Sequence, residues 1–433
     1  MKNFTQRHGG TKDTEEGKVR GIHGLTRKGK GWEVMKLGEV CDFYNGLWTG
    51  KKPPFQTVGV IRNTNFTKDC LLDDTDIVYL EVEQSQFKNR KLQFGDIILE
   101  KSGGGPKQPV GRVVVYDKKE GDFSFSNFTS VIRIKNSKQL DFVFLHKFLF
   151  HEYLSGATEK MQSHSTGIRN LKFDEYKEIP IPLPSLSEQK HIVAILNECF
   201  TAIDKVKANV EKNLINAREL FESYLQGVFG SSNYATKREW EERKLGEIAD
   251  IEYGYTDKAD TSGDYRYIRI TDIDCEGLLS SKEKVYIKST IENKAFVLNQ
   301  NDLLMARTGA TFAKVLLYEN VEPSIFASYL IRIKFKIKID SRFYWHFSKS
   351  KMYWDQANRL SSGAAQPQFN GNALKQVFFC YPKSLEEQKA IACQLDSLRI
   401  ETQKLEMVYN KKIADLEELK KSVLQKAFAG ELK

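Results

Sequence analysis

The feature that most constrains the fold of this chain is that its second half repeats its first. The segment at 183–190 recurs at 381–389, and each copy opens a long amphipathic stretch. Upstream, the Lys-Leu-Gly-Glu sequence at 36–39 recurs at 244–247. Landmarks within the amphipathic stretches repeat at a constant offset of 199 residues. The duplication predicts one structural frame built twice, with different loops in each copy.

The expected fold class is α+β, with five segments along the chain. The order is a disordered, basic tail at 1–31, a first α/β domain at 32–184, a helix at 185–230, a second α/β domain at 231–383 and a C-terminal helix at 384–433. The tail lacks the apolar segment of a secretory signal, and no run is apolar enough to predict a membrane span. Six scattered cysteines fit a cytoplasmic protein with reduced thiols.

The two amphipathic stretches predict long helices that pack together. Ser185 and Ser384 are each followed three residues later by glutamate, which is the pattern of a capping box. Apolar residues then recur in steps of three and four, with one extra four-residue step at the matching place in both stretches. A helix of about 45 residues spans about 65 Å. The seam positions expected to pack between the helices include Leu196, Ile203, Val210, Leu214, Leu395, Leu405, Tyr409 and Ile413.

Short aliphatic runs predict strands in both α/β regions. They lie at 97–99, 113–116 and 131–134 in the first region and at 267–270, 303–305, 315–318 and 330–333 in the second. The sequences match the strand at 130–135 with the one at 329–334. An aromatic-rich helical patch follows in each region, at 142–153 and 343–353.

Polar loops in equivalent places carry the candidate binding residues. Glycines in the first loop pair allow the backbone to approach a phosphate, although a tight turn remains an alternative and the spacing of a nucleotide-binding P-loop is absent. The candidate binding residues of this loop pair are Lys101, Ser102, Lys107, Gln108 and Arg112 in the first region and Arg307, Thr308 and Lys314 in the second. The polar side chains of the second loop pair suit either contact with base edges or an ordinary turn. The candidates are Ser165, Arg169 and Asn170 in the first region and Ser362, Gln366 and Gln368 in the second. Tyr44, Asn45, Tyr253 and Tyr255 are further candidates for DNA contact, with burial in the core as the alternative.

No pattern of catalytic residues stands out. The net charge of +9 permits an anionic partner without requiring one. Residues 52–55 resemble the Pro-Pro-aromatic loop of amino-methyltransferases, but a lysine occupies the position that needs a hydrogen-bond acceptor. The histidines and cysteines lack metal-ligand spacing. We therefore expect no catalytic residue, no metal and no cofactor bound by this chain.

In the order of its doubled motifs the chain resembles the specificity subunit of type I restriction–modification systems. The resemblance rests on the Trp-x-x-x-Lys-Leu-Gly-Glu entries that begin at Trp32 and Trp240, the strands at 95–99 and 301–305, the helix starts and the final segment at 424–432. It implies two target-recognition domains similar to those of type II adenine methyltransferases, joined by two antiparallel helices that form a coiled-coil spacer with pseudo-two-fold placement. The domains would read the two halves of a bipartite site in double-stranded DNA.

The resemblance also implies partner proteins. Two modification subunits would methylate adenine N6 with S-adenosylmethionine, and restriction subunits would add translocation and cleavage that use ATP and Mg. Because the two loop sets differ, the expected site is asymmetric. Alternatives are a methylation-only or phase-variable orphan specificity subunit, a free-standing DNA-binding nuclease, and a coiled-coil scaffold without a DNA role.

Overall fold

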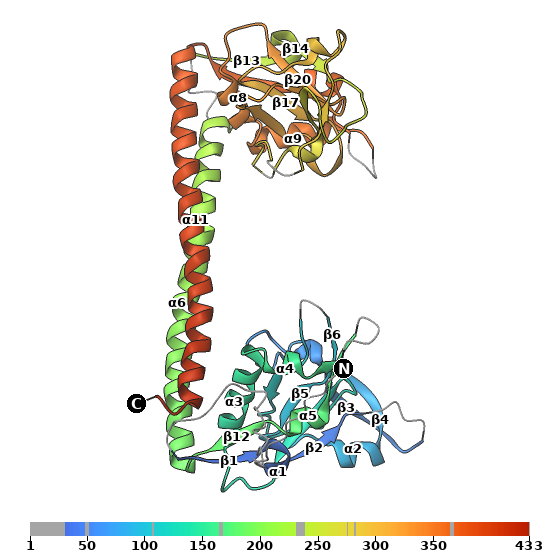
Figure 1. Cartoon of the computed structure of the whole chain (residues 1–433), viewed down its shortest axis with the longest axis vertical. Coiled ribbons are helices and arrows are strands. Elements are labelled where there is room, and N and C mark those ends of the chain that lie inside the picture. The colour runs from blue at the N-terminus through green and yellow to red at the C-terminus, as the bar shows by residue number, and fades with distance from the viewer. Residues whose placement is uncertain are drawn as a thin grey trace, which may run out of the picture. The chain divides into compact units, whose positions relative to one another are not determined.

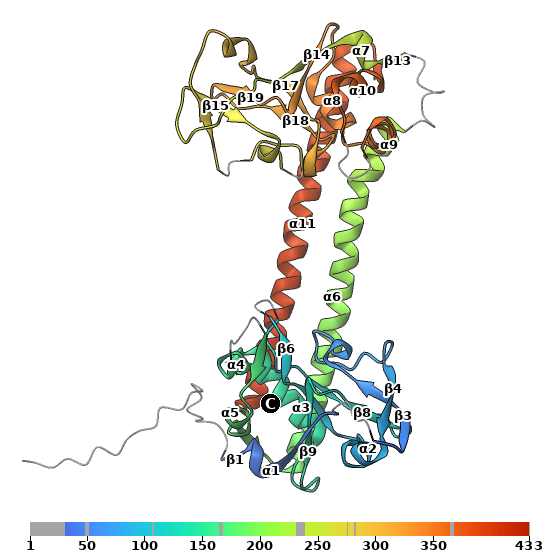
Figure 2. The same ribbon diagram turned by 90° about the vertical axis from the view of Figure 1, so that its right-hand side faces the viewer.

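The structure, a computed structural model, describes residues 31–47, 52–105, 108–163, 168–230, 239–274, 276–280, 283–363 and 368–432. The chain forms two compact units (Figures 1 and 2). The first contains the residues up to Lys207 and those from Ala414 onward, and the second contains Ala208–Ile413. Each unit combines an α/β region with part of both long helices, so the predicted α+β class is confirmed.

A four-stranded antiparallel sheet forms the centre of the first unit. Its order is β2 (Cys41–Asn45), β9 (Thr129–Ile134), β5 (Ile97–Glu100) and β7 (Val113–Val115). Every residue of β5 is buried, with Ile97 and Leu99 in one core and Ile98 in another. Since alternate side chains of a strand point to opposite faces, burial of both faces explains the uninterrupted aliphatic run.

Smaller sheets and short helices complete the first unit. The sheets are β4 (Val78–Glu83) with β3 (Phe55–Ile61) and β8 (Phe123–Phe125), β1 (Glu33–Lys36) with β12 (Pro180–Leu183), and β10 (Gln162–Ser163) with β11 (Arg169–Leu171) and β6 (Ser102–Gly104). The helices are α1 (Leu37–Val40), α2 (Gln84–Arg90), α3 (Phe142–Leu154), α4 (Ala157–Lys160) and α5 (Phe173–Lys177), with a 3₁₀ turn η1 at Asn63–Asn65.

The second unit repeats the order of the first unit's four-stranded sheet, of its β4-β3-β8 sheet and of its two-stranded sheet. Its sheets are β14 (Ala249–Tyr253), β20 (Leu330–Phe335), β17 (Asp302–Ala306) and β18 (Val315–Tyr318) in that order, β16 (Tyr286–Ile287) with β15 (Tyr265–Ile268) and β19 (Ser324–Phe326), and β13 (Trp240–Lys244) with β21 (Phe378–Pro382). The helices are α7 (Leu245–Ile248), α8 (Ser341–Phe347), α9 (Lys351–Leu360) and α10 (Gly371–Lys375), with 3₁₀ turns η3 (Ile270–Asp272), η4 (Asn293–Phe296) and η5 (Gly309–Thr311).

Strand pairing corrects the predicted match between the two halves. Cys41 follows α1 and pairs with Ile134, whereas Ala249, which follows α7, pairs with Phe335. Phe335 lies two residues beyond Ile333, the residue that sequence matching equates with Ile134. A shift of two residues keeps the same side chains on the same face, which is why the hydrophobic pattern conceals it.

The aromatic helical patch of the second unit is interrupted, which differs from the single helix that the pattern predicts at 343–353. Helix α8 ends at Phe347 and α9 begins at Lys351. Ser350 between them donates its hydroxyl to the Phe347 carbonyl and accepts from the Tyr353 amide at 3.3 Å. The serine therefore ends one helix and caps the next.

The two long helices are α6 (Leu186–Phe229) and α11 (Leu385–Phe428), each of 44 residues. The predicted serine caps are confirmed: the hydroxyls of Ser185 and Ser384 accept from the amides three residues later at 3.3 and 3.4 Å. A complete capping box predicts that the Glu387 carboxylate accepts from the serine amide. Glu387 instead accepts from the Trp240 indole N–H at 3.1 Å. That bond ties β13 to the start of α11.

The helices run antiparallel in each unit (Figure 2). In the first unit the early part of α6 shares a core with the end of α11, through Leu196, Phe200, Leu424 and Phe428. In the second unit the end of α6 shares a core with the early part of α11, through Leu225, Phe229, Ala392 and Leu395. The predicted pairing of the two helices is confirmed.

The predicted seam is buried unevenly. Four of its positions are buried, namely Leu196, Ile203, Val210 and Leu395. Leu214, Tyr409 and Ile413 are half-buried, and Leu405 is 39% exposed, which is less burial than a continuous seam predicts. Two helices packed on each other enclose only a narrow stripe, so residues at its edge keep solvent contact where no α/β element covers them.

The glutamine of the repeated helix-entry motif is a buried connector. Gln189 is fully buried, and its Oε1 accepts from the Asp141 amide at 2.8 Å. Its Nε2 donates to the carbonyls of Gln139 and Pro184 at 2.8 and 2.9 Å. Asp141 is the N-cap of α3, so this amide joins the start of α6 to the start of α3. Gln388 is also fully buried.

A carboxylate of α11 holds α8 in the second unit. Asp396 accepts from His346 Nε2 at 3.0 Å and from Arg342 Nη1 at 2.7 Å. Burial opposes ionisation of Asp396, but these two partners outweigh it and lower its pKa from 3.8 to about 2. A folded-state pKa below the unfolded value stabilises the fold above about pH 4. This contribution, about 2 kcal/mol, is lost as the pH falls from about 4 to about 2.

We therefore expect Asp396→Asn to remove part of the acid sensitivity of the second unit. Asparagine occupies the equivalent first-unit position, Asn197, so the side chain suits the helix. The measurement is the free energy of unfolding in denaturant between pH 2 and pH 7 for both proteins. Identical pH profiles would rule out the assigned role of Asp396.

None of the helices in the described ranges has the length and apolar composition needed to cross a bilayer.

Candidate nucleic-acid interface

The two predicted loops of the first unit meet in one small sheet. Strand β11 pairs with β6, and Asn170 lies opposite Ser102. The Leu171 amide donates to the Lys101 carbonyl at 2.8 Å, and the Ser102 hydroxyl donates to the Asn170 side-chain oxygen. Segments about 70 residues apart in sequence are thus joined into a single polar surface, which we call the first junction.

The second unit contains the equivalent arrangement. The Phe369 amide donates to the Arg307 carbonyl at 2.8 Å, which matches the bond between Leu171 and Lys101. Isolated bridges connect Gln368 with both Thr308 and Ser362. This second junction places Gln368 where the first has Asn170, and Arg307 where the first has Lys101.

The cation at each junction has a different neighbour. Lys101 Nζ donates to the Asn45 side-chain oxygen at 2.9 Å, and burial lowers the pKa of Lys101. The Arg307 guanidinium lies over the rings of Tyr253 and Tyr329, 5.6 and 4.9 Å from their centres. A guanidinium stacked on tyrosine is held in place while its edge can still donate hydrogen bonds.

An exposed aromatic residue, which the sequence pattern does not single out, lies beside each cation. The Lys101 amide donates to the Phe128 carbonyl at 3.0 Å, and the Arg307 amide donates to the Tyr329 carbonyl at 3.1 Å. Phe128 is 45% exposed and Tyr329 is 51% exposed. Since an exposed aromatic beside a cation can stack on a base, both residues join the candidate interface. The sequence signal for these two residues is an aromatic side chain one position before β9 and β20. Matching the two halves by sequence conceals it, because that match differs by two residues from the structural one.

A close backbone approach explains the glycines that directly follow β2 and β14, in the sequences Asn45-Gly46 and Tyr253-Gly254. A Cβ added to Gly46 would lie 1.8 Å from the Ser126 carbonyl oxygen. One added to Gly254 would lie 2.3 Å from the Ala327 carbonyl oxygen. These carbonyls accept from the amides of Thr129 and Leu330 and so close the turns that present Phe128 and Tyr329. Only glycine permits this backbone approach.

Arg112 does not belong to the interface, contrary to its prediction as a phosphate contact. It is 7% exposed, and its Nε and Nη2 each donate to the Glu100 carboxylate at 2.8 Å. Nη1 donates to the Phe66 carbonyl and Nη2 to the Asn63 carbonyl at 3.1 Å. With its donors directed to these buried acceptors, Arg112 acts within the fold.

Several other predicted residues have structural contacts of their own. Tyr44 is half-buried beneath the Arg133 guanidinium, 4.9 Å from its ring centre. Tyr255 packs on Phe296, with ring centres 5.5 Å apart. Arg169 forms an ion pair with Glu159 at 3.0 Å. Gln108 is exposed and bridges to Gly105. Lys107, Ser165 and Gln366 lie outside the described residues and stay predictions.

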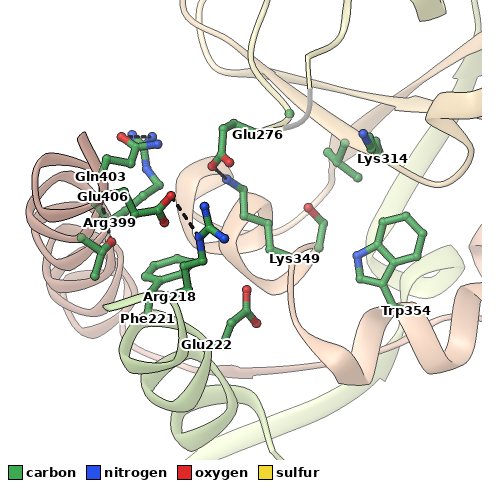
Figure 3. Close-up of a pocket in the computed structure, with 14 residues that line it drawn as sticks. Arg218, Phe221, Glu222, Glu276, Lys314, Lys349, Trp354, Arg399, Gln403 and Glu406 are labelled. Carbon is green, nitrogen blue, oxygen red and sulfur yellow. Dashed lines mark hydrogen bonds and ion pairs between the residues drawn. The ribbon is translucent and has the colours of Figure 1, made fainter. Parts of the chain in front are cut away.

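Lys314 lines a cavity of about 360 Å³ in the second unit instead of the junction (Figure 3). The cavity lies between the loop at 276–277 and the two long helices. Carboxylates lie among its cations: Arg218 pairs with Glu406 at 3.2 Å and Lys349 pairs with Glu276 at 3.8 Å. Burial lowers the pKa of Lys349 to about 8. This mixture of charges does not favour a polyanion such as DNA.

The described part of the chain contains no group of three or more His, Cys, Asp or Glu side chains placed to hold a metal ion.

The duplicated frame and its two junctions define a family. Residues 29–216 and 237–415 each match the model of the type I restriction modification DNA specificity domain. These matches cover most of the sequence, so the chain belongs to this family and carries its domain twice.

Curated relatives resemble the chain over nearly its whole length. It is 26% identical to the type I restriction enzyme StySPI specificity subunit of Salmonella potsdam, over 93% of this chain and 89% of that protein. It is 24% identical to the MjaVIII specificity subunit of Methanocaldococcus jannaschii, over 97% of each.

Two solved structures share the fold. A chain from a study of complex assembly and conformational transition in a type I R-M system aligns with a TM-score of 0.74 at 18% identity, over 94% of this chain and 99% of that one. The HsdS subunit from Thermoanaerobacter tengcongensis aligns with a TM-score of 0.58 at 19% identity, over 93% and 97%.

Proposed function

We propose that this chain is the DNA-specificity subunit of a type I restriction–modification complex. The observation that carries the proposal is the pair of equivalent junctions in a chain that contains the family's domain twice. The same backbone frame presents different side chains, with Lys101, Ser102 and Asn170 at the first junction and Arg307, Thr308 and Gln368 at the second. We infer that the two units read different halves of a bipartite, asymmetric site.

Within each junction we assign two tasks. Asn170 and Gln368 carry side-chain amides, which can accept and donate to the edge of adenine at the same time. Lys101 and Arg307 carry the positive charge that holds the phosphate backbone. Phe128 and Tyr329 supply apolar surface beside the cations. The chain thus carries the side chains needed for sequence-specific DNA binding.

The chemistry in this proposal resides in partner subunits. Modification subunits would bring S-adenosylmethionine and methylate adenine N6, and restriction subunits would use ATP and Mg for translocation and cleavage. This chain would bind none of these cofactors and would act on DNA in the cytoplasm. A methylation-only system would contain the same chain without a restriction partner, and restriction of unmethylated phage in the host distinguishes the two.

The test is genome-wide mapping of N6-methyladenine in cells with the gene, without it, and with single variants. We expect one bipartite motif that disappears with the gene. Gln368→Ala should make only one half of that motif degenerate, and Asn170→Ala only the other half, because each removes an amide from one junction. Loss of one bidentate contact corresponds to about 1–3 kcal/mol, or roughly 5- to 150-fold in discrimination.

The matched control is Asn299→Ala, which removes an exposed amide of the second unit. It should leave the motif unchanged. Lys101→Ala and Arg307→Ala should instead lower methylation at all sites and reduce the salt dependence of DNA binding. If Gln368→Ala and Asn170→Ala relax the same half, or neither does, the assignment of one reader to each unit fails.

A further inference from the structure

Among the described residues, three ion pairs join α6 to α11, and two of them occupy equivalent positions. In the first unit Lys207 pairs with Glu417, with side chains 27% and 44% exposed. In the second unit Arg218 pairs with Glu406 at 3.2 Å, with side chains 55% and 31% exposed. Each pair joins the two helices within its own unit.

The two pairs use equivalent positions. At the offset of 199 residues that relates α6 to α11, Lys207 corresponds to Glu406 and Arg218 corresponds to Glu417. The same two helix positions are therefore paired twice. In both cases α6 supplies the cation and α11 supplies the carboxylate.

This arrangement matters because each long helix is otherwise suited to pair with the same helix of a second copy of the chain. Their seams have the same irregular spacing, and buried leucines occupy equivalent positions at Leu196 and Leu395. In the geometry seen here, α6 packed against a second α6 would place Lys207 opposite Arg218. Likewise, α11 packed against a second α11 would place Glu406 opposite Glu417.

A third contact has the same effect on α11. Lys420 is 6% exposed and pairs with Asp204 of α6 at 3.4 Å and with Asp69 at 2.9 Å. The α11 position equivalent to Asp204 is Gln403. Self-pairing of α11 would therefore exchange a carboxylate beside Lys420 for a neutral amide.

We propose that these charges select the partner of each long helix, so that α6 pairs with α11 and rejects the α6 of a second copy. A chain with two equivalent halves can exchange helices with another copy, as in domain swapping. Charges beside an apolar seam are the usual means by which helices distinguish partners. The inference concerns assembly and is independent of the DNA-reading role.

The test reproduces, within the full chain, the like-charge contacts that self-pairing would create. Glu406→Lys with Glu417→Arg gives α11 the charges of α6, and Lys207→Glu with Arg218→Glu gives α6 the charges of α11. All four substitutions together restore both opposite-charge pairs. We expect each double variant to melt about 4 °C below the wild type at low salt, and the fourfold variant to melt near it.

Salt provides a check on the physical cause. Because the side chains are partly exposed, 1 M NaCl should remove most of the difference between the double variants and the wild type. Circular dichroism should show equal helix content in all proteins before melting. Equal melting temperatures at low salt, or no recovery in the fourfold variant, would overturn the proposal.

Exchange between copies gives a second readout. The two double variants carry complementary charges, so a helix of one should prefer a helix of the other. Differently tagged full chains, coexpressed, should copurify about tenfold more than two tagged wild-type copies. If both combinations copurify equally, the charges stabilise the fold without selecting the partner, and the proposal is wrong.

Discussion

Arg112→Ala is expected to lower the free energy of unfolding of the first unit by about 3–5 kcal/mol. The substitution leaves the Glu100 carboxylate, which is 1% exposed, without the guanidinium that neutralises it. It also removes the donors that reach the carbonyls of Phe66 and Asn63. A buried charge without a partner costs far more than the lost contacts alone. Denaturant unfolding of the variant and the wild type provides the measurement.

The second unit supplies the control for this prediction. The Glu100 amide donates to the Arg112 carbonyl as the Ala306 amide donates to the Lys314 carbonyl, so the four residues occupy equivalent positions. Alanine replaces the carboxylate there, and we expect Lys314→Ala to cost less than about 1 kcal/mol. Replacing both members of the first pair, as in Arg112→Met with Glu100→Leu, should recover most of the loss. If Arg112→Ala weakened DNA binding without changing stability, Arg112 would belong to the interface after all.

Gln388→Ala is expected to lower the stability of the second unit by about 3 kcal/mol, or about 1 kcal/mol for each of three buried hydrogen bonds. Gln388 Oε1 accepts from the Asp340 amide at 2.8 Å. Its Nε2 donates to the carbonyls of Lys338 and Pro382 at 3.4 and 2.9 Å. Alanine would leave these backbone groups without their partner and would create a cavity. The measurement is the midpoint and slope of denaturant unfolding.

Three comparisons sharpen this second prediction. Gln189→Ala should have a similar cost in the first unit, because Gln189 makes the equivalent bonds. Gln388→Glu keeps the acceptor but loses both donors, so we expect no rescue. Lys389→Ala changes the exposed neighbour and should be nearly neutral. A loss below about 1 kcal/mol for Gln388→Ala would show that the amide is dispensable.

The duplication made the architecture predictable from sequence. The serine caps located the starts of both long helices to within a residue, because a cap and an apolar stripe are local properties. The central strands β5, β7, β9, β17, β18 and β20 were predicted for the same reason, since a doubly buried strand is a continuous aliphatic run, whereas the run predicted at 267–270 leaves its strand, β15, after Ile268. The break between α8 and α9 was missed because Ser350 lies within an aromatic run that suggests one helix.

The candidate site was predictable only in part. Sequence placed Lys101, Asn170, Arg307 and Gln368 in paired loops, and the structure brings each pair together through backbone bonds. The position of Arg112 could not be predicted, because a basic residue near glycines looks the same whether it faces solvent or a buried carboxylate twelve residues away. Phe128 and Tyr329 were hidden because the halves align there with a shift of two residues.

The main-chain closure of the two junctions has a consequence for evolution. Each junction is closed by a backbone hydrogen bond, from the Leu171 amide to the Lys101 carbonyl and from the Phe369 amide to the Arg307 carbonyl. Such bonds do not depend on side-chain identity. Side chains at these positions can therefore vary while the loops stay joined. A lineage carrying this gene could acquire a new target by point mutation or by recombining one half, without rebuilding the frame that supports it.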